Sequence, residues 1–258
     1  MEAATRLLAR DPLRNIVLLK HLQGYAGHTR LHHVADGDRN GFLVVLDAAA
    51  TSWDRRTYPA ARFIVLISSD GPDLTRALLD HVPRGVGLVF KLAGEAHRDA
   101  VEGRFALERR MSILSFTAPP PELADLPVEP DIRVGPDPGD AAFALFAAQD
   151  HARDWLQPML DTGRAFACVA GPAAAPRAVC FAYENWPGVW EIGGVFTPEA
   201  GRRRGHGARV VRAALRELGR RGHAPRYQVH DRNLPSIGLA ESAGLRRFLD
   251  LTHYVHTP

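Results

Sequence analysis

The chain of 258 residues is long enough for one large domain or two small ones, because domains commonly run about 100 to 200 residues. With 46% hydrophobic and 24% charged residues, its composition is that of a globular protein and excludes disordered and fibrous classes. The net charge of +3 is too weak by itself to indicate nucleic-acid binding, since dedicated binders concentrate their charge on one face.

The cysteines and the N-terminal segment narrow the class further. Cys168 and Cys180 are too few for a disulfide framework or a cysteine-based zinc site, and we expect buried reduced thiols that face each other across a hairpin. Charged residues such as Glu2 and Arg10 interrupt the first apolar run, unlike the core of a signal peptide. No segment approaches the roughly 18 apolar residues of a membrane helix. We therefore expect a cytoplasmic protein without a membrane partner.

The first half of the chain has the order of elements typical of an α+β unit. Apolar runs rich in β-branched residues alternate with segments of helical period. In chain order, the patterns predict strands at 29–35, 41–48, 62–69, 85–92 and 105–117, and helices at 72–82 and 95–102. His32 and His33 lie next to each other on the first strand and so point to opposite faces, which disfavours a shared metal site.

A proline-rich segment separates the two halves. Between Thr117 and Pro130 the sequence holds five prolines and neither a helical nor a strand period. Because proline fixes φ and removes a backbone donor, this pattern predicts a stiff, extended linker. The expected organisation is a first domain at 1–117, a linker at 118–130 and a second domain at 131–258.

The second half repeats the order of the first. The patterns predict strands at 131–135, 164–171, 177–184, 188–196, 226–230 and 245–256, two short helices within 138–162, and helices at 205–221 and 234–244. In the longest helix Val211, Ala214, Leu215 and Leu218 recur with helical period and form its apolar face. The chain therefore reads as two weakly similar copies of one unit.

The turn before that helix, "TPEAGRRRGHGA", concentrates positive charge and flexibility. A helix N-terminus carries unpaired N–H groups and about half a positive charge. Gly205 and Gly207 allow a phosphate to approach the backbone closely, and Arg202–Arg204 add side-chain charge. The pattern predicts a pyrophosphate site, with a solvated basic turn as the ordinary alternative. Because G-K-[ST] is missing, a Walker-type nucleotide loop is excluded.

The same turn resembles the acetyl-CoA loop of the GNAT superfamily of N-acetyltransferases, whose pattern is Q/R-x-x-G-x-G/A. The run Arg202–Gly207, followed by Ala208, matches it, and Asn233, Ser236 and Gly244 resemble the later N-x-x-S-x-x-L-Y-E-x-x-G-F segment. The resemblance covers about 131–258. It implies an α+β fold of tandem GNAT-like domains, each a mixed, mostly antiparallel sheet flanked by helices, in which two central strands splay apart to admit acetyl-CoA.

The resemblance also implies site residues. Acetyl-CoA, the expected cosubstrate, would contact Val195, Phe196, Thr197, Arg202, Arg203, Arg204, Gly205, His206, Gly207, Ala208, Asn233 and Ser236. Glu191, eleven residues before Arg202, stands where many members carry the general base, and a salt-bridged carboxylate is its alternative role. No metal is expected.

One position departs from the family pattern. The usual general acid is the tyrosine of the L-Y-E segment, and this chain has Ala240 there. Ser236 or Tyr254 could replace it, or the thiolate could leave unassisted. Gly193 and Gly194 weaken the strand after Glu191, which indicates either a close approach of ligand or backbone, or a bulge.

The corresponding turn of the first half lacks these features. It has one glycine, Gly71, and two carboxylates, Asp70 and Asp73, where a phosphate would lie. Since like charges repel, we expect 1–117 to be a degenerate copy that cannot hold CoA.

The expected function is acyl-CoA dependent transfer, most simply of acetyl, to the amine of a small molecule or amino-acid-like acceptor. A non-catalytic acyl-CoA sensor is the alternative, motivated by Ala240. Nucleic-acid binding by "RRRGHGAR" is disfavoured because no aromatic residue interleaves the arginines. We expect a monomer or homodimer. Acceptor determinants are expected within 150–163, where His151, Asp154 and Trp155 lie, and helix packing is the ordinary role for Trp155.

Overall fold

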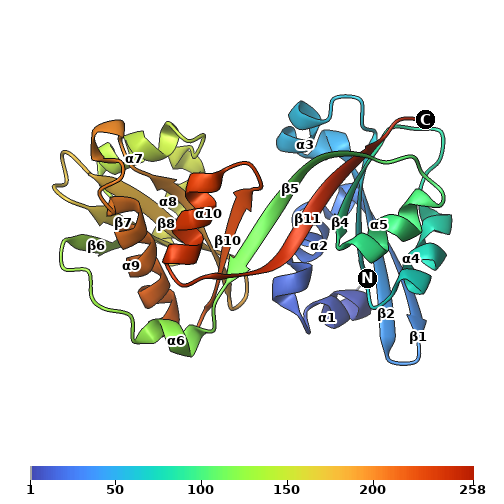
Figure 1. Cartoon of the computed structure of the whole chain (residues 1–258), viewed down its shortest axis with the longest axis horizontal. Helices are drawn as coiled ribbons and strands as arrows, with labels where there is room; N and C mark the ends of the chain where they lie inside the picture. The colour runs from blue at the N-terminus through green and yellow to red at the C-terminus, as the bar shows by residue number, and fades with distance from the viewer. Residues whose placement is uncertain (1) are drawn as a thin grey trace. The chain divides into compact units, whose positions relative to one another are not determined.

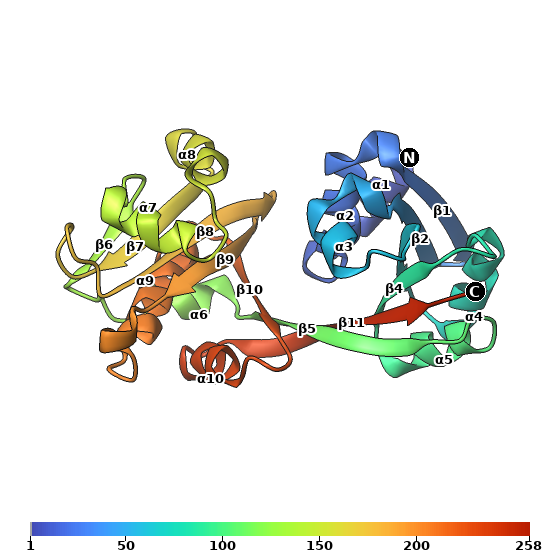
Figure 2. The same ribbon diagram turned by 90° about the horizontal axis from the view of Figure 1, so that it is seen from above.

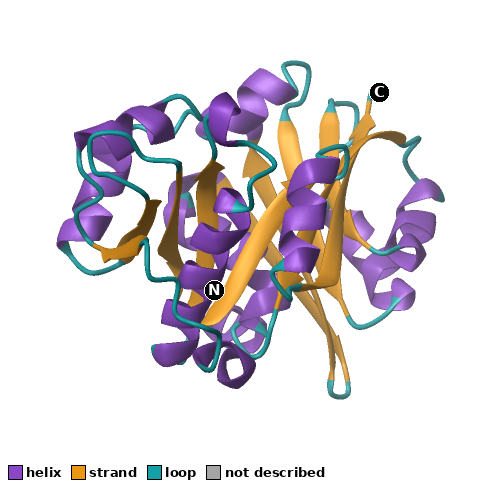
Figure 3. Ribbon diagram, turned by 60° about the vertical axis from the view of Figure 1, so that its left-hand side comes forward, coloured by secondary structure: helices purple, strands orange, loops and turns teal. Residues whose placement is uncertain are grey.

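The structure, a computed structural model, describes residues 2–258. The chain forms two compact units (Figure 1). Unit 1 comprises the chain up to Leu114 together with Leu249–Pro258, and unit 2 comprises Ser115–Phe248. In each unit, strands are flanked by helices (Figure 3), so the α+β class expected from the sequence is confirmed. Within the described residues, no helix is both long and apolar enough to cross a lipid bilayer.

Unit 1 is built on a mixed sheet in the order β1-β2-β3-β4-β11-β5. All neighbours with a defined register are antiparallel except β3 and β4, which run parallel. Its strands are β1 (Thr29–Asp36), β2 (Arg39–Asp47), β3 (Phe63–Ser69), β4 (Leu88–Ala93) and parts of β5 (Glu108–Thr117) and β11 (Arg246–His256). Its helices are α1 (Glu2–Leu8), α2 (Pro12–Gly24), α3 (Ser52–Thr57), α4 (Pro72–Leu78) and α5 (Glu95–Glu102), with 3₁₀ turns at Ala26–His28, Ala48–Ala50 and Leu79–His81.

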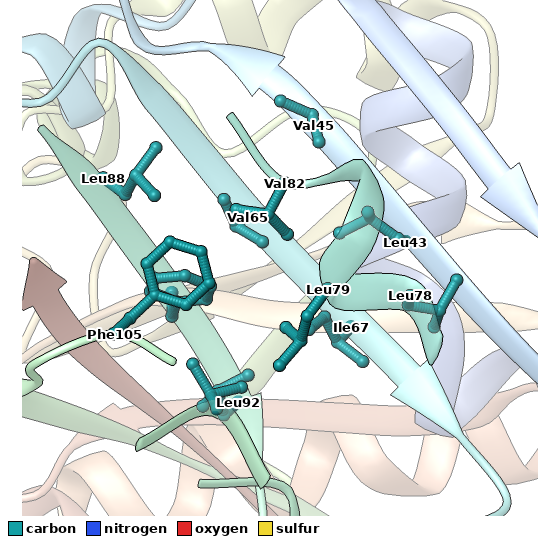
Figure 4. Close-up of a cluster of buried hydrophobic side chains, with 12 residues drawn as sticks. Leu43, Val45, Val65, Ile67, Leu78, Leu79, Val82, Leu88, Leu92 and Phe105 are labelled. Atoms are coloured by element: carbon teal, nitrogen blue, oxygen red, sulfur yellow. The ribbon is translucent and has the colours of Figure 1, made fainter. Parts of the chain in front are cut away.

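The core of unit 1 lies between this sheet and two helices. Leu43 of β2, Val65 of β3 and Leu88 of β4 pack with Leu78 and Phe105 in one buried cluster (Figure 4). Figure 2 shows α4 and α5 on this face of the sheet and α1, α2 and α3 on the other. Because both faces are covered, the central strands are apolar throughout instead of alternating.

Unit 2 repeats this plan with the order β6-β7-β8-β9-β10-β5. Its strands are β6 (Ile132–Gly135), β7 (Ala165–Ala170), β8 (Ala178–Trp186), β9 (Val189–Phe196), β10 (Ala224–His230) and the end of β5. Its helices are α6 (Pro120–Ala124), α7 (Asp140–Ala147), α8 (Arg153–Asp161), α9 (His206–Arg220) and α10 (Leu234–Ser242), with a 3₁₀ turn at Glu199–Gly201. Figure 2 shows α7 and α8 on one face of the sheet and α9 and α10 on the other.

Two sequence expectations about unit 2 are confirmed. Cys168 and Cys180 are register partners on the hairpin of β7 and β8, and both are buried, free thiols. In α9, Val211, Ala214, Leu215 and Leu218 are all buried, as their helical period predicts.

The proline-rich segment is part of unit 2 and does not form the expected stiff linker. Helix α6 begins with Pro120 and Pro121, at positions where a helix tolerates proline because their N–H groups would be unpaired anyway. Glu129 then accepts hydrogen bonds from Arg209 and Arg212 of α9 at 2.7 and 2.9 Å. The helix escaped sequence analysis because it is little more than one turn long and shows no period.

The C-terminal boundary also differs from the expected 131–258 domain. Strand β11 is continuous, but from Leu249 onward it belongs to unit 1, where Leu251 pairs with Ala93 and His256 with Leu88. Its partner strand β4 is therefore more than 150 residues away in the sequence. A local pattern identifies a strand but not its neighbour, which is why the expected boundary was misplaced.

Candidate functional site

The central feature of unit 2 is a fork between two parallel strands. β9 and β10 are paired from Val189 with Ala224 to Ile192 with Tyr227. Beyond this rung, β9 continues to Phe196 and β10 to His230, and the described residues show no further register pairs between them. The main-chain groups on the inner edges of the fork therefore remain available to an extended ligand.

A bulge on β9 shapes the mouth of this fork. The register with β8 shifts between Val179, which pairs with Phe196, and Phe181, which pairs with Gly193. Gly194 adopts φ +58°, and a Cβ atom there would lie 2.3 Å from the Phe181 ring. Glycine is required here on both counts. Of the two explanations that the sequence left open, the structure thus contains the bulge, and the close neighbour is a side chain of the protein itself.

Helix α9 begins just beyond the fork with unpaired N–H groups. Its N-cap residue, Gly205, has φ +76° and provides no side-chain cap, and the first turn contains no acidic residue. A Cβ atom on Gly207 would lie 3.1 Å from Leu239 and 3.3 Å from the Thr197 hydroxyl, so the backbone is closely packed there. Arg203 adopts φ +59°, which is unusual for a residue with a side chain. The turn is thereby folded so that the helix end faces solvent without a carboxylate.

The arginines around this helix end are largely uncommitted. Arg202 donates a hydrogen bond to the Thr197 carbonyl at 3.3 Å, whereas Arg203 and Arg204 form no ion pair within residues 2–258. A cavity of about 580 Å³ adjoins the turn and is lined by Pro176, Arg177, Pro198, Ala200, Gly201, Arg204 and His206. Its lining is cationic and has no carboxylate, and the buried His206 Nδ1 has no hydrogen-bond partner among the described residues. This cationic lining favours the binding of an anion.

Glu191 forms an ion pair at the base of the fork. Its Oε2 accepts hydrogen bonds from Arg226 Nη1 at 2.7 Å and from Asn185 at 2.6 Å. The Arg226 side chain is fully buried and that of Glu191 is 14% exposed. Burial and, next, the charge of Glu191 raise the pKa of Tyr183 well above its usual value, so this phenol is a hydrogen-bond donor. A charge as buried as that of Arg226 needs such a partner. The structure thus contains the ion pair expected as the alternative role of Glu191, and its role as general base stays a prediction.

The later motif lies on α10. Asn233 caps the helix, because its side chain accepts a hydrogen bond from the Ser236 N–H at 3.2 Å. The Ser236 hydroxyl is 2.7 Å from the Tyr227 hydroxyl, and burial raises the pKa of Tyr227. Ala240, at the family's tyrosine position, is fully buried. The helix therefore places Ser236, together with Tyr227 of the last paired rung, beside the fork.

Tyr254 belongs to unit 1, whereas the other candidates belong to unit 2. It lies on the part of β11 that belongs to unit 1, opposite Phe90, and packs against the buried cluster of that unit. Its position is thus explained by the core of unit 1.

Several residues at the site were not identified from the sequence. Arg226 lies on β10, whose mixed sequence APRYQVH does not indicate that the guanidinium is fully buried and ion-paired. Arg177 and Tyr183 gave no signal. Arg177 reaches the cavity only in the folded chain, and Tyr183 meets Glu191 only through the pairing of β8 with β9. Within the described residues, no group of three His, Cys, Asp or Glu side chains could hold a metal ion.

The corresponding turn of unit 1 is closed by its own side chains. Arg39 binds Asp73, in the first turn of α4, through both guanidinium nitrogens at 3.1 and 2.9 Å. This hydrogen bonding lowers the pKa of Asp73, which stays ionised. Asp70 accepts the Asn40 N–H at 2.8 Å, and Arg14 donates to the Ser69 carbonyl at 2.7 Å. The groups that would meet an anion are therefore already occupied.

Comparison with known proteins agrees with this geometry. Residues 121–245 match the acetyltransferase (GNAT) family model. A search of curated proteins gives no match.

Solved structures match over nearly the whole chain. An acetyltransferase of the GNAT family from Colwellia psychrerythraea has a TM-score of 0.59 at 13% identity, covering 93% of this chain and 89% of that one. A GCN5-related N-acetyltransferase from Kribbella flavida has a TM-score of 0.57 at 16% identity, covering 99% and 96%. A tandem GNAT protein from the clavulanic acid biosynthesis pathway has a TM-score of 0.50 at 12% identity, covering 95% and 88%. At these identities the similarity concerns the fold.

Proposed function

We propose that unit 2, in which residues 121–245 match the acetyltransferase (GNAT) family model, transfers an acyl group, in the simplest case acetyl from acetyl-CoA, to the amine of a small molecule. The observation that carries the proposal is the fork of β9 and β10, which leads directly to a helix end with free N–H groups, three arginines and no carboxylate. An extended acyl-CoA fits such a site, since its pantetheine amides need backbone partners and its pyrophosphate needs cationic ones.

In this proposal each part of the donor has a defined place. The backbone of Val195, Phe196 and Thr197, on the unpaired edge of β9, pairs with the pantetheine amides. The pyrophosphate lies on the start of α9, within reach of the groups of the turn. These groups are Arg202, Arg203, Arg204, Gly205, His206, Gly207 and Ala208. Asn233 and Ser236, at the start of α10, complete the opposite wall.

The reaction is direct attack of the amine on the thioester carbonyl carbon. The C–N bond forms, the C–S bond breaks, and the electron pair of the C–S bond leaves on the CoA sulfur. A main-chain N–H near Val195 stabilises the developing oxyanion. Glu191 receives the amine proton, directly or through a water molecule, and its contacts with Arg226 and Asn185 fix the carboxylate in place.

The leaving thiolate requires a donor other than the usual tyrosine. With alanine at position 240, the hydroxyl of Ser236 is the nearest candidate on α10, and Tyr227 orients it through their 2.7 Å contact. Tyr254 has no such support, because its ring packs in the core of unit 1.

Calorimetric titration with acetyl-CoA tests the donor site. We expect the double variant Arg202→Ala/Arg204→Ala to bind about 10- to 100-fold more weakly, since each charge-assisted phosphate contact contributes on the order of 1 kcal/mol or more. Arg76→Ala, on α4 of unit 1, is the control and should bind acetyl-CoA with the affinity of the wild type. Unchanged affinity in a folded double variant would refute the assignment.

A second candidate function has specific support. The usual tyrosine is replaced by Ala240, and the carboxylate of Glu191 is committed to an ion pair with a fully buried arginine. Both observations also fit a protein that binds acyl-CoA as a sensor. Release of free thiol from acetyl-CoA in the presence of amines distinguishes the two: a transferase releases it, and a sensor binds acetyl-CoA with the same affinity but leaves the thioester intact.

Unit 1 is proposed to be a degenerate copy that holds no CoA. The support is the pair of Asp73 with Arg39 at the start of α4, which places a carboxylate where unit 2 leaves the helix end open.

A further inference from the structure

We propose that the acyl acceptor of unit 2 is a cationic primary amine attached to an aromatic or similarly flat apolar group, with no acidic group beside the amine. This rests on the proposed acyl transfer and names its substrate class. It starts from four side chains on β8 and around α8, which we call the aromatic cluster: His151, Trp155, Phe181 and Tyr183.

The aromatic cluster adjoins the segment where the thioester is proposed to lie. Phe181 is fully buried, and its ring packs over Gly193 and Gly194, where Cβ atoms would be 3.0 and 2.3 Å away. Tyr183, two residues along β8, is the register partner of Glu191. The cluster and the proposed base therefore share one region of the sheet, next to the bulge of β9.

Trp155 gives this region an open aromatic surface. Its ring meets Phe181 and Tyr183 edge-on, with centroids 5.8 and 5.3 Å apart, and His151 meets Phe181 edge-on at 5.0 Å. Although these neighbours hold it, Trp155 keeps 44% of its surface exposed. A large ring that is fixed in position and still exposed is suited to receive a flat apolar group.

The charges around the aromatic cluster favour a ligand with a positive charge. Asp150 and Asp154 are exposed on either side of His151 and form no ion pair among the described residues. Asp150 also adopts φ +60°, a conformation that few residues with side chains take. The nearby cations, in contrast, are all paired: Arg153 with Asp140, Arg164 with Glu184, and Arg226 with Glu191.

An ammonium group is favoured by this arrangement and a carboxylate is not. An ammonium group gains from the aromatic faces and from the two aspartates. A carboxylate next to the amine would meet those aspartates, while the three arginines beside the aromatic cluster are already paired with carboxylates of the protein. Burial lowers the pKa of His151, so at neutral pH its imidazole is uncharged and does not repel a cation. Amino acids are therefore disfavoured relative to the corresponding decarboxylated amines.

A matched pair of acceptors tests the charge argument. We expect kcat/KM for 2-phenylethylamine to exceed that for phenylalanine, which differs by one carboxylate, by about 100-fold, because like charges in close contact are strongly unfavourable. Thiol release from acetyl-CoA is the measurement. Equal or better use of phenylalanine would overturn the proposal.

Substitution of Trp155 tests the aromatic argument. In Trp155→Ala we expect the KM for 2-phenylethylamine to rise about tenfold, the effect of one cation–π and stacking partner, with the KM for acetyl-CoA unchanged. Trp155→Phe should restore most of the loss. Trp53→Ala is the matched control, since Trp53 belongs to unit 1 and is similarly exposed at 43%. An unchanged amine KM in folded Trp155→Ala would also overturn the proposal.

Direct binding separates this inference from the proposed function. 2-Phenylethylamine is titrated calorimetrically into the protein alone and into the protein saturated with CoA. If acetyl-CoA fails to bind, the proposed function fails, while amine binding that depends on Trp155 still supports the inference. If acetyl-CoA binds but 2-phenylethylamine neither binds nor releases thiol, the inference fails and the donor site stands.

Discussion

The two units differ in the turn that joins a parallel strand to the following helix. In both, a parallel strand pair stops at a defined rung, Leu66 with Lys91 in unit 1 and Ile192 with Tyr227 in unit 2, and a helix follows. At the start of α4, Asp73 and its partner Arg39 fill the position in front of the helix; α9 has neither a side-chain cap nor an acidic residue in its first turn. A helix end is open to an external anion only where the protein supplies no carboxylate of its own.

The units also differ in how they pair a buried cation. Lys91 of β4 binds Asp54 at 2.8 Å, and the two side chains are only 6% and 3% exposed. Asp54 belongs to α3, which has no counterpart at this place in unit 2; there Arg226 binds Glu191 of the neighbouring strand, and Glu191 remains partly accessible. Unit 1 thus seals its ion pair, whereas unit 2 keeps its carboxylate where a substrate could reach it.

Breaking each ion pair should show this difference most strongly. We expect Lys91→Met to lower the free energy of unfolding by about 4 kcal/mol, since it leaves the fully buried carboxylate of Asp54 unpaired. Arg226→Met should lower it by about 3 kcal/mol, since Glu191 keeps its hydrogen bond from Asn185. Urea denaturation, followed by hydrogen exchange to assign the loss to a unit, is the measurement. The double variant Lys91→Met/Asp54→Leu should recover most of the stability. A loss of stability in Arg226→Met as large as that in Lys91→Met would contradict burial of the remaining carboxylate as the cause of the difference.

The units should also differ in their response to acid. Burial, followed by the charge of Lys20, lowers the pKa of His21 in unit 1 to about 4 from 6.5. Because the folded pKa lies below the unfolded one, the stability is complete above pH 6.5 and falls as the pH drops toward 4. The expected loss from this group is about 3 kcal/mol. Urea denaturation of wild type and His21→Leu at several pH values measures it, and parallel curves for the two proteins would exclude His21.

Giving unit 2 the charges of unit 1 should abolish the contrast at the helix ends. We expect Arg203→Glu/Arg204→Glu to weaken acetyl-CoA binding about 100-fold, because carboxylates then face the pyrophosphate as Asp73 does in unit 1. The reverse change, Asp73→Asn, should leave the calorimetric stoichiometry at one CoA per chain, since Asp70 and Arg14 still occupy the turn. A second binding event in Asp73→Asn would show that one carboxylate alone closes unit 1.

The smallest expected effect concerns the cavity beside the donor turn. Arg177→Ala should weaken CoA binding about threefold, an effect in the range of an exposed charge contact. Binding of dephospho-CoA should be less affected, because it lacks the 3′-phosphate that we expect to lie in this cavity. Competition with the two compounds measures the ratio. Equal losses for both would place the 3′-phosphate elsewhere.

The local geometry around the proposed donor site could be predicted from the sequence. The turn "GRRRGHGA" and the apolar face of α9 are local patterns, and local geometry follows from them: Gly205 has the positive φ of an N-cap glycine, and Val211 and Leu215 are buried. The partner of Glu191 could not be predicted in the same way. An ion pair was one of its two expected roles, but Arg226 lies 35 residues further along the chain, and no local pattern connects the two residues.

The sequence by itself determined the order of the strands, the helices α4, α5 and α7–α10, the apolar faces and the charged turn, because these depend on neighbours within a few residues. Only the tertiary structure decided that 118–130 packs on α9, that β11 completes unit 1, and that the Phe181 ring lies over the bulge at Gly194. Each of these depends on which distant segments meet. Strand pairing and side-chain packing select those partners by shape and burial, which no local pattern encodes.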